Sequence, residues 1–449
     1  MMFPDGFVWG AAAASYQIEG AVDTDGKGPS VWDVFAHRPG AVWNGHHGDV
    51  ACDHYHRFEE DVALMKAIGL GAYRLSICWP RVLPVGHGEI NDKGLAFYDR
   101  LIDELVAAGI EPWVTLFHWD YPQALFERGG WLNRDSPEWF AEYTSRIVER
   151  LSDRVRHWVT LNEPRVFIGY GHREGKHAPG VLLSWPEVLR AAHHVLLAHG
   201  HAVQAIRAAS RTPCQIGYAP IGLPTLPETE APEDVELARR LTFQMRERTL
   251  WSNSWWMDPV FRGSYPEDGL ALHGADMPRF PSSDLDIIRQ PLDFCGANTY
   301  MALPAREHEG SADGWPPGHP RTGCNWPVTP DALYWGPRFL HERYGLPLVI
   351  TENGVSCRDS VFLDGKVHDP LRIDFLTRYL RALHRVISDG VPVRGYFHWS
   401  IMDNFEWAEG FKERFGLVFV DYATQHRLLK DSAYWYQQVI ATNGSVALG

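Results

Sequence analysis

The sequence predicts an α/β fold in which eight parallel strands alternate with helices and close into one barrel with long connecting loops. Short apolar runs rich in β-branched and aromatic residues recur along the chain, and helical patterns separate several of them. This alternation is typical of βα units and of a parallel sheet. No low-complexity linker divides the 449 residues, and no repeat is visible beyond the alternation itself. We therefore expect a single-domain (β/α)8 barrel, or TIM barrel, over residues 1–449.

The expected strands are short apolar segments that polar, glycine or proline residues interrupt. In chain order they span residues 8–12, 72–77, 112–117, 157–161, 215–219, 294–298, 348–351 and 395–399. Helical patterns lie between several of them, for example at 94–108 and 137–151. The stretches 223–232 and 305–330 are rich in Pro, Gly and polar residues, which predicts long βα loops over one mouth of the barrel. A doubly wound open sheet is the alternative, but no GxGxxG motif follows the first strand, which weakens its dinucleotide-binding form.

Composition narrows the class of protein. Hydrophobic residues make up 45% of the chain and charged residues 22%, as in ordinary soluble globular proteins. The net charge of -14 argues against a nucleic-acid partner or an anionic membrane surface. The six cysteines are scattered without a CxxC motif, which favours reduced thiols and the cytoplasm over a disulfide framework or a zinc site. No apolar stretch approaches the ~18–20 residues of a membrane helix, and no basic region precedes the apolar run at 7–14.

Two histidine-rich stretches, at 46–56 and 193–201, invite a metal interpretation. On a helix, His193 and His194 point about 100° apart, so they cannot both face one ion together with His199 and His201. The first stretch leads into an expected helix, where a structural role is the better interpretation. We therefore expect neither a metal ion nor another cofactor.

Polar residues cluster directly after several expected strands. The groups are His118-Trp119-Asp120, Asn162-Glu163-Pro164, Asn298-Thr299-Tyr300, Glu352-Asn353-Gly354 and, beyond Trp399, Asp403-Asn404-Phe405-Glu406-Trp407. The carboxyl ends of the strands of a TIM barrel converge on one site, so these groups should line a single pocket. Two glutamates among amides and indoles suit glycoside hydrolysis, in which one carboxyl group protonates the leaving oxygen while the other attacks. Taken singly, a glutamate after a strand is more often a capping or ion-pairing residue.

Several segments, in the same order, resemble the signature motifs of glycoside hydrolase family 1, the β-glucosidase family. The two central ones are Thr160-Leu161-Asn162-Glu163-Pro164 and Ile350-Thr351-Glu352-Asn353-Gly354. Others are Phe7-Val8-Trp9-Gly10, Ser15-Tyr16-Gln17-Ile18-Glu19-Gly20, Asp403-Asn404-Phe405-Glu406-Trp407 and Glu413-Arg414-Phe415-Gly416. One tetrapeptide could arise by chance, but several in the right order are specific, and together they span almost the whole chain.

The resemblance implies a barrel that hydrolyses β-glycosides with retention of configuration through a covalent glycosyl-enzyme. Glu163 matches the acid/base of the family and Glu352 its nucleophile, a pair that in retaining enzymes lies about 5–5.5 Å apart. Arg74 resembles the arginine beside the nucleophile, and Tyr300 the tyrosine that hydrogen-bonds to it. A cation and a hydrogen-bond donor both favour the carboxylate form of Glu352.

The resemblance also implies a substrate site and a preference for unphosphorylated sugars. Its members are Gln17, His118, Trp119, Asn162, Asn298, Trp326, Trp399, Glu406, Trp407 and Phe415. Members that prefer 6-phosphorylated glycosides carry a serine and a lysine where this chain has Glu406-Trp407-Ala408-Glu409, and a glutamate there would repel phosphate. The expected function is therefore a β-glucosidase that removes terminal β-D-glucosyl residues, and also β-galactosides or β-fucosides, from cellobiose-like oligosaccharides and aryl glycosides.

One residue departs from the family pattern, and the preferred aglycone is therefore undecided. Many members continue Asn-Glu-Pro with tryptophan, whereas this chain has Arg165, which we expect to favour polar aglycones over flat aromatic ones. A 6-phospho-β-glycosidase and a catalytically inactive sugar-binding barrel are the alternative functions. The choice among glucose, galactose and fucose, transfer to acceptors other than water, and the oligomeric state stay open.

Overall fold

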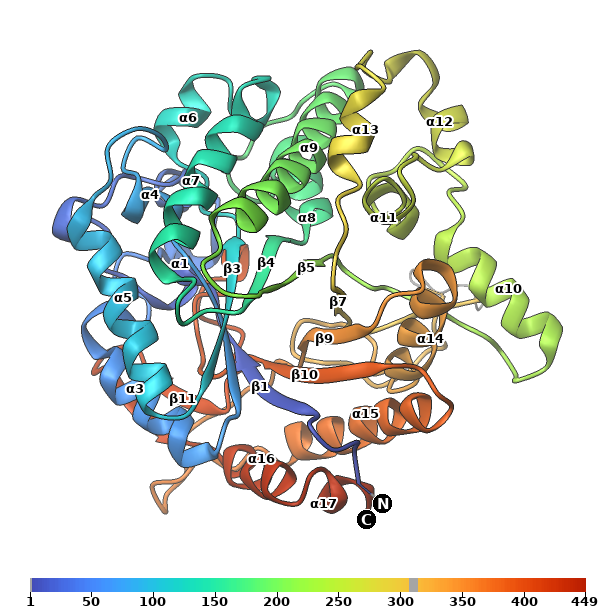
Figure 1. Ribbon diagram of the computed structural model, residues 1–449. Helices are drawn as coiled ribbons and strands as arrows, with labels where there is room; N and C mark the ends of the chain where they lie inside the picture. Colours follow the sequence, from blue (N-terminus) through green and yellow to red (C-terminus); the bar gives the residue numbers. More distant parts are fainter. Residues whose placement is uncertain (1, 307–313) are drawn as a thin grey trace.

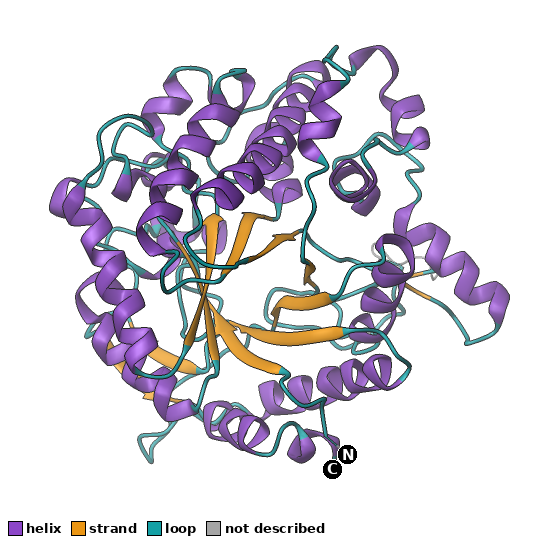
Figure 2. Cartoon of the chain, in the orientation of Figure 1, coloured by secondary structure: helices purple, strands orange, loops and turns teal. Residues whose placement is uncertain are grey.

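The computed structural model describes residues 2–306 and 314–449. A closed barrel of parallel strands forms its centre, and helices surround it (Figure 1, Figure 2). The barrel runs β1-β2-β3-β4-β5-β7-β9-β10, and β10 pairs with β1 to close it. These strands are β1 Val8–Ala12, β2 Ala72–Ser76, β3 Glu111–Phe117, β4 His157–Asn162, β5 Gln215–Ala219, β7 Phe294–Asn298, β9 Leu348–Asn353 and β10 Val393–Trp399. The predicted (β/α)8 barrel is confirmed.

Two strands extend beyond their predicted carboxyl ends, and the extension concerns the site. β4 ends at Asn162 and β9 at Asn353, where the sequence predicts ends at residues 161 and 351. Backbone pairing continues through these polar residues, with Asn162 opposite Ala219 and Glu352 opposite Asn298. Ladder hydrogen bonds depend on the backbone and not on side-chain polarity, so the apolar pattern stops before the strand does. The sheet therefore holds Asn162 and Glu352 rigidly.

The helices form the outer layer of the barrel. They are α1 Ser15–Ile18, α2 Val31–Ala36, α3 His54–Ile68, α4 Trp79–Val82, α5 Asp92–Ala107, α6 Gln123–Glu127, α7 Ser136–Leu151, α8 Pro164–Ile168, α9 Trp185–Ala209, α10 Pro232–Phe243, α11 Asn253–Arg262, α12 Glu267–His273, α13 Ser283–Ile288, α14 Ala332–Tyr344, α15 Pro370–Ser388, α16 Asp431–Ala441 and α17 Ser445–Leu448. The start of α9 illustrates their local origin: the Glu187 carboxylate accepts hydrogen bonds from the backbone N–H and hydroxyl of Ser184 in a capping box. The predicted helices 94–108 and 137–151 correspond to α5 and α7.

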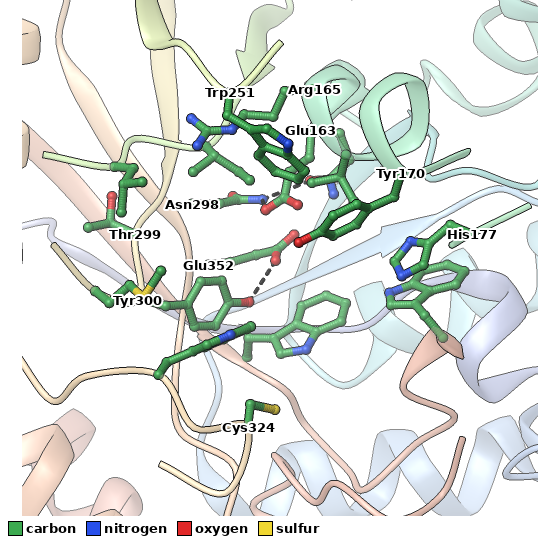
Figure 3. A pocket seen from close by; sticks show the side chains of 18 of the residues that line it. Glu163, Arg165, Tyr170, His177, Trp251, Asn298, Thr299, Tyr300, Cys324 and Glu352 are labelled. Atoms are coloured by element: carbon green, nitrogen blue, oxygen red, sulfur yellow. Dashed lines mark hydrogen bonds between the residues drawn. The ribbon is translucent and has the colours of Figure 1, made fainter. Parts of the chain in front are cut away.

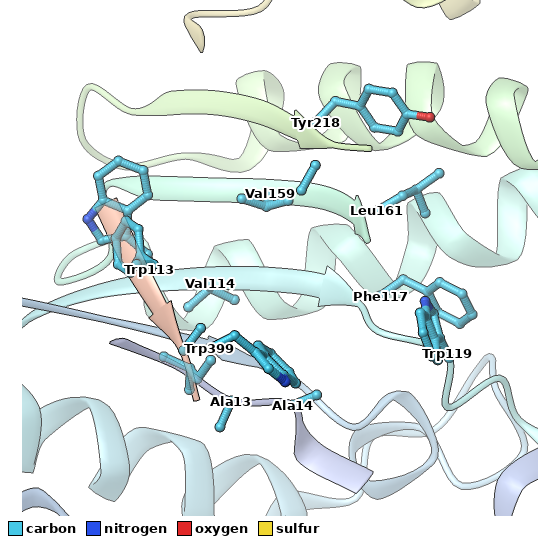
Figure 4. Packing of buried hydrophobic residues seen from close by; sticks show 14 of the residues in the cluster. Ala13, Ala14, Trp113, Val114, Phe117, Trp119, Val159, Leu161, Tyr218 and Trp399 are labelled. Atoms are coloured by element: carbon cyan, nitrogen blue, oxygen red, sulfur yellow. The ribbon is translucent and has the colours of Figure 1, made fainter. Parts of the chain in front are cut away.

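The inside of the barrel is apolar at the amino ends of its strands. Trp113 packs against Phe294 and Phe397, with ring centroids 5.4 and 5.0 Å away. Gly10 and Gly217 make room, because a Cβ there would lie 2.6 Å from Phe397 and 2.2 Å from Phe294. Figure 4 shows Trp113 far along the strands from Phe117 and Leu161, which lie near the carboxyl ends. This packing closes one end of the barrel, so polar side chains gather at the other.

The two expected loops differ in structure. The stretch 223–232 contains a short strand, β6 (Thr225–Leu226), which pairs with β8 (Leu303–Pro304). Within 305–330, residues 307–313 lie outside the described residues, and the described remainder carries only a bridge between Arg321 and Pro327. A β-hairpin of β11 (Val418–Asp421) and β12 (His426–Leu429) follows the barrel. None of the helices in the described ranges has the length and apolarity needed to cross a bilayer.

Candidate active site

A cavity of about 1070 Å³ opens at the carboxyl ends of the barrel strands (Figure 3). Ligand cavities of enzymes commonly have volumes of about 300–1,000 Å³. The predicted site residues that line it are His118, Trp119, Asn162, Glu163, Asn298, Tyr300, Trp326, Glu352, Trp399, Glu406, Trp407 and Phe415. The other two predicted residues, Arg74 and Gln17, lie behind this lining and hydrogen-bond to Glu352 and Glu406. All the predicted residues therefore converge on one place.

Glu352 is held by a cation on one oxygen and a hydroxyl on the other. Arg74 Nη1 donates to Glu352 Oε1 at 2.6 Å, and Tyr300 Oη donates to Glu352 Oε2 at 2.7 Å, the contact dashed in Figure 3. Arg74 is itself fixed, because its Nη2 donates to Asn162 Oδ1 at 2.6 Å and its Nε to Thr115 Oγ1 at 3.0 Å. The carboxylate of Glu352 thus has one orientation and two strong donors.

Glu163 caps α8 in a conformation that few side chains adopt. Its φ of 46° and ψ of 61° place it in the left-handed region, which costs free energy for a residue other than glycine. Asn298 Nδ2 donates to Glu163 Oε1 at 2.8 Å, and Thr351 Oγ1 donates to Asn298 Oδ1 at 2.6 Å, which fixes the direction of that amide. The strained turn and the oriented amide aim the Glu163 carboxyl group into the cavity beside Glu352.

The two carboxyl groups differ in how readily they ionise. Burial, and then the nearby Glu352, raise the pKa of Glu163 to about 8, against weaker opposition from Asn298, Arg165 and Arg74. Burial also raises the pKa of Glu352, but the charge and hydrogen bond of Arg74 and the hydroxyl of Tyr300 oppose it. The pair therefore keeps its proton on Glu163 and its negative charge on Glu352, since only Glu352 has a guanidinium in contact.

Polar groups around Glu406 suit a ligand rich in hydroxyl groups. Three acceptors lie within hydrogen-bond distance of Gln17 Nε2: Phe405 O at 2.8 Å, Asn404 Oδ1 at 3.0 Å and Glu406 Oε2 at 3.3 Å. The other amide atom, Gln17 Oε1, is buried and accepts no hydrogen bond from the described residues. Burial, and then the neighbouring Glu352, raise the pKa of Glu406 to about 8. An unpaired buried acceptor costs free energy until a donor arrives.

His118 is a neutral side chain with a defined tautomer. Burial, with a smaller contribution from Arg74, holds its pKa well below the usual range. Asn162 Nδ2 lies 3.1 Å from His118 Nε2, so this amide donates and the ring proton stays on Nδ1. Because the Asn162 carbonyl oxygen also accepts from Arg74, the orientation of the amide is fixed.

Aromatic rings build the rest of the wall. Trp407 contacts Trp119, at 4.3 Å between ring centroids, and Tyr16, whose ring is nearly parallel at 6.2 Å. Trp119 and Trp407 both have positive φ angles, of 84° and 51°, so two of the rings sit on strained backbone, as Glu163 does. At the other side Trp326 packs 5.3 Å from Tyr300 and 6.1 Å from Phe415. Indole faces of this kind suit the C–H faces of a sugar ring.

The histidines of the two rich stretches mostly have structural partners. His54 pairs with Asp61 at 2.7 Å, and His193 with Asp284 at 3.0 Å. His194 and His199 bond to Trp131 O and Thr160 Oγ1. Within the described ranges one group could geometrically hold a metal ion, formed by His37, His47 and Asp49. Its histidines are exposed and each already contacts the Asp49 carboxylate.

Many residues of the cavity lining were not among the predictions, and three of them carry aromatic rings that bear on the site. Tyr170 and Trp251 line the cavity beside Glu163, and His177 lines it farther away, beyond Tyr170 (Figure 3). They belong to loops and short helices beyond the strand ends, where no periodic pattern marks a residue as facing the site. An aromatic residue in a polar loop, such as Trp251 after Arg248 and Thr249, is the one signal that could have indicated them.

Two glutamates of unequal acidity are buried at the carboxyl ends of β4 and β9 of a (β/α)8 barrel. This arrangement is that of a glycoside hydrolase. The chain belongs to glycosyl hydrolase family 1, whose sequence profile matches residues 1–445. It is 45% identical to β-glucosidase A of Acetivibrio thermocellus, over 98% of this chain and 99% of that protein. It is 42% identical to a bifunctional β-D-glucosidase/β-D-fucosidase of Bifidobacterium breve, over 99% of each.

Solved structures give the same result. A family 1 β-glucosidase from Thermotoga maritima matches with a TM-score of 0.91 at 43% identity, over 98% of each chain. A β-glucosidase from Thermotoga maritima in complex with glucoimidazole also matches with a TM-score of 0.91 at 43% identity, over 99% of each chain. The resemblance seen in the sequence motifs is thus confirmed.

Proposed function

We propose that this family 1 enzyme is a β-glucosidase that hydrolyses terminal, non-reducing β-D-glucosyl residues with retention of configuration. The observation that carries the proposal is the unequal pair: Arg74 and Tyr300 donate to Glu352 at 2.6 and 2.7 Å and favour its carboxylate, whereas burial beside Glu352 raises the pKa of Glu163 to about 8. Relatives named as β-glucosidases, and a structure named as a complex with glucoimidazole, support a glucose-like glycone. The relative named as a bifunctional glucosidase and fucosidase supports β-fucosides as further substrates. The further proposal of β-galactosides comes from the sequence motifs alone.

The reaction follows as a double displacement. Glu352 attacks the anomeric carbon while Glu163 gives its proton to the leaving oxygen, so that a covalent glycosyl-enzyme and a free alcohol form. Glu163, now a carboxylate, then takes a proton from water as the water attacks the same carbon, and Glu352 leaves. Arg74 and Tyr300 keep Glu352 ionised before the attack and stabilise it again as the leaving group of the second step.

We propose that the polar groups around Glu406 and two indole rings bind the glycone. We assign hydroxyl contacts to Gln17, His118, Asn162 and Glu406, and ring packing to the indoles of Trp399 and Trp407. The free Oε1 of Gln17 would accept from a sugar hydroxyl, and a protonated Glu406 could donate as well as accept. Trp119, Asn298, Trp326 and Phe415 complete the proposed substrate site.

Two alternative functions are less well supported. A 6-phospho-β-glycosidase needs cations near the 6-position of the sugar, but the cavity lining carries the carboxyl groups of Glu406, Glu409 and Glu413. The one lysine among the described lining residues, Lys412, is ion-paired to Glu409. An inactive sugar-binding barrel does not require two carboxyl groups of opposite ionisation. We also infer that residues 1–449 act as one catalytic domain, and that the free thiols of the six cysteines suit a cytoplasmic setting.

A panel of aryl β-glycosides tests the substrate. We expect turnover of the β-glucoside and β-fucoside, and a kcat/KM for the 6-phospho-β-glucoside lower by about 100-fold or more, because like charges disfavour the phosphate. The β-galactoside and β-mannoside complete the panel, and proton NMR should detect β-glucose as the first product. A release of α-glucose first, or faster turnover of the phosphorylated substrate, would contradict the proposal.

The pH dependence of kcat/KM tests the assignment of the acid. A group with a raised pKa is protonated below it, so hydrolysis of a glucoside with a poor leaving group should fall as pH rises through about 8. The loss at low pH should follow protonation of Glu352. As a control, a 2,4-dinitrophenyl glucoside needs little protonation and should show a weaker alkaline loss. If kcat/KM fell equally at high pH for both substrates, and still did so in Glu163→Gln, the alkaline loss would belong to the titration of another group.

A further inference from the structure

Arg165 is a buried cation in the wall of the active-site cavity. It lies on α8, two residues after Glu163, and is 4% exposed. It lines the cavity beside Glu163, Tyr170 and Trp251 (Figure 3). In the proposed reaction Glu163 gives its proton to the leaving oxygen, so the groups beside Glu163 adjoin the leaving group. Arg165 is therefore placed to meet the leaving group.

The protein satisfies only part of this guanidinium. Arg165 Nη1 donates to Asn253 Oδ1 at 3.1 Å, and its central carbon lies 5.3 Å from the centroid of the Trp251 ring. Its Nε is buried with no hydrogen-bond partner among the described residues, and Nη2 makes no hydrogen bond to them either. Nε is enclosed by protein, so Nη2 is the N–H group of this guanidinium that is left to donate to a ligand in the cavity.

Other buried arginines of this chain each have a carboxylate in contact. Arg74 pairs with Glu352 at 2.6 Å, Arg81 with Glu19 at 2.9 Å, and Arg372 with Asp359 at 2.7 Å. Within residues 2–306 and 314–449, no ion pair includes Arg165. A buried charge without a partner is costly, and burial lowers the pKa of Arg165 to about 10. The nearby Glu163 opposes this only when it is ionised, and it carries its proton when substrate binds.

We propose that Arg165 is an anion receptor in the leaving-group part of the cavity, and that the preferred substrates are β-glucosides whose aglycone carries a carboxylate. This inference rests on the proposed function. Nη2 would donate to an oxygen of the carboxylate, while the rings of Trp251 and Tyr170 contact the rest of the aglycone. A tryptophan at this position would offer an indole ring without a positive charge.

Two aryl glucosides that differ in one group test the receptor. The 4-carboxyphenyl and 4-carbamoylphenyl β-glucosides have nearly the same shape, but only the first carries a charge. We expect the ratio of their kcat/KM values to fall by about 10-fold or more in Arg165→Met, as for the loss of a hydrogen bond to a charged group. Arg165→Lys should keep part of the ratio, because it keeps the positive charge without the planar guanidinium. Comparing variants cancels the intrinsic difference between the two leaving groups.

A matched control separates a direct contact between Arg165 and the carboxylate from the general electrostatic effect of a positive charge in the cavity. Arg246 lines the same cavity but is exposed, so Arg246→Met removes an equal charge and should leave the ratio unchanged. A purely structural role of Arg165 would lower both kcat/KM values together, and an unchanged ratio in Arg165→Met would overturn the inference. Trapping of a glycosyl-enzyme by 2,4-dinitrophenyl 2-deoxy-2-fluoro-β-glucoside tests the proposed function separately. If this inhibitor forms a glycosyl-enzyme while the ratio is unchanged in Arg165→Met, the receptor proposal fails and the proposed function stands.

Discussion

Glu352→Gln is expected to abolish turnover of every β-glucoside, with kcat lower by about 10⁵-fold or more, the scale seen when a nucleophile is removed. An amide cannot attack the anomeric carbon, so the loss should not depend on the leaving group. The variant keeps the shape of the side chain and an oxygen for Arg74 or Tyr300 to bond to. Steady-state kinetics with 2,4-dinitrophenyl and unactivated glucosides, together with circular dichroism of the purified variant, provide the measurement.

The product of a rescue experiment identifies the residue chemically. In Glu352→Ala, azide should occupy the space left beside Arg74 and attack the face that Glu352 attacks, which yields an α-glycosyl azide. The matched control is Glu409→Gln, an exposed carboxylate of the same cavity, which should behave as the wild type. Retention of substantial turnover in Glu352→Gln, or a β-glycosyl azide from Glu352→Ala, would remove Glu352 from the role of nucleophile.

Glu163→Gln is expected to divide substrates by leaving group. For glucosides with poor leaving groups, kcat/KM should fall by about 10²–10⁴-fold, the usual contribution of a general acid. For a 2,4-dinitrophenyl glucoside it should fall far less, because this leaving group departs without a proton. The slow step should then become hydrolysis of the glycosyl-enzyme, since no base activates water, and a burst of dinitrophenolate should precede steady turnover.

Azide gives the complementary result for this residue. In Glu163→Ala, azide should attack the glycosyl-enzyme from the side that water uses, and the product should be a β-glycosyl azide. The opposite anomers expected from the Glu352 and Glu163 variants distinguish the two roles without reference to rates. Equal losses of kcat/KM for good and poor leaving groups in Glu163→Gln would contradict the assignment of the acid.

The barrel and the location of the site could be predicted because both depend on local patterns. Runs such as 215–219 and 294–298 are apolar and β-branched or aromatic enough to be recognised without their neighbours, and the structure keeps those bounds. Prediction was poorer at the ends of β4 and β9, where Asn162 and Asn353 remain paired to neighbouring strands. Pairing across a sheet is a relation between distant segments, which a single apolar pattern does not contain.

The sequence by itself determined the barrel, the family and the two glutamates, because strand periodicity and motif order are properties of neighbouring residues. Only the tertiary structure decided how those glutamates differ, since burial and the contacts of Arg74, Tyr300 and Asn298 set their pKa values. It likewise decided the meaning of Arg165. The residue type in the sequence showed a departure from a pattern, but only the fold buries that charge beside Glu163, the proposed acid/base, without a carboxylate partner among the described residues. Charge interactions depend on distance and on exclusion of water, and the folded chain alone creates both.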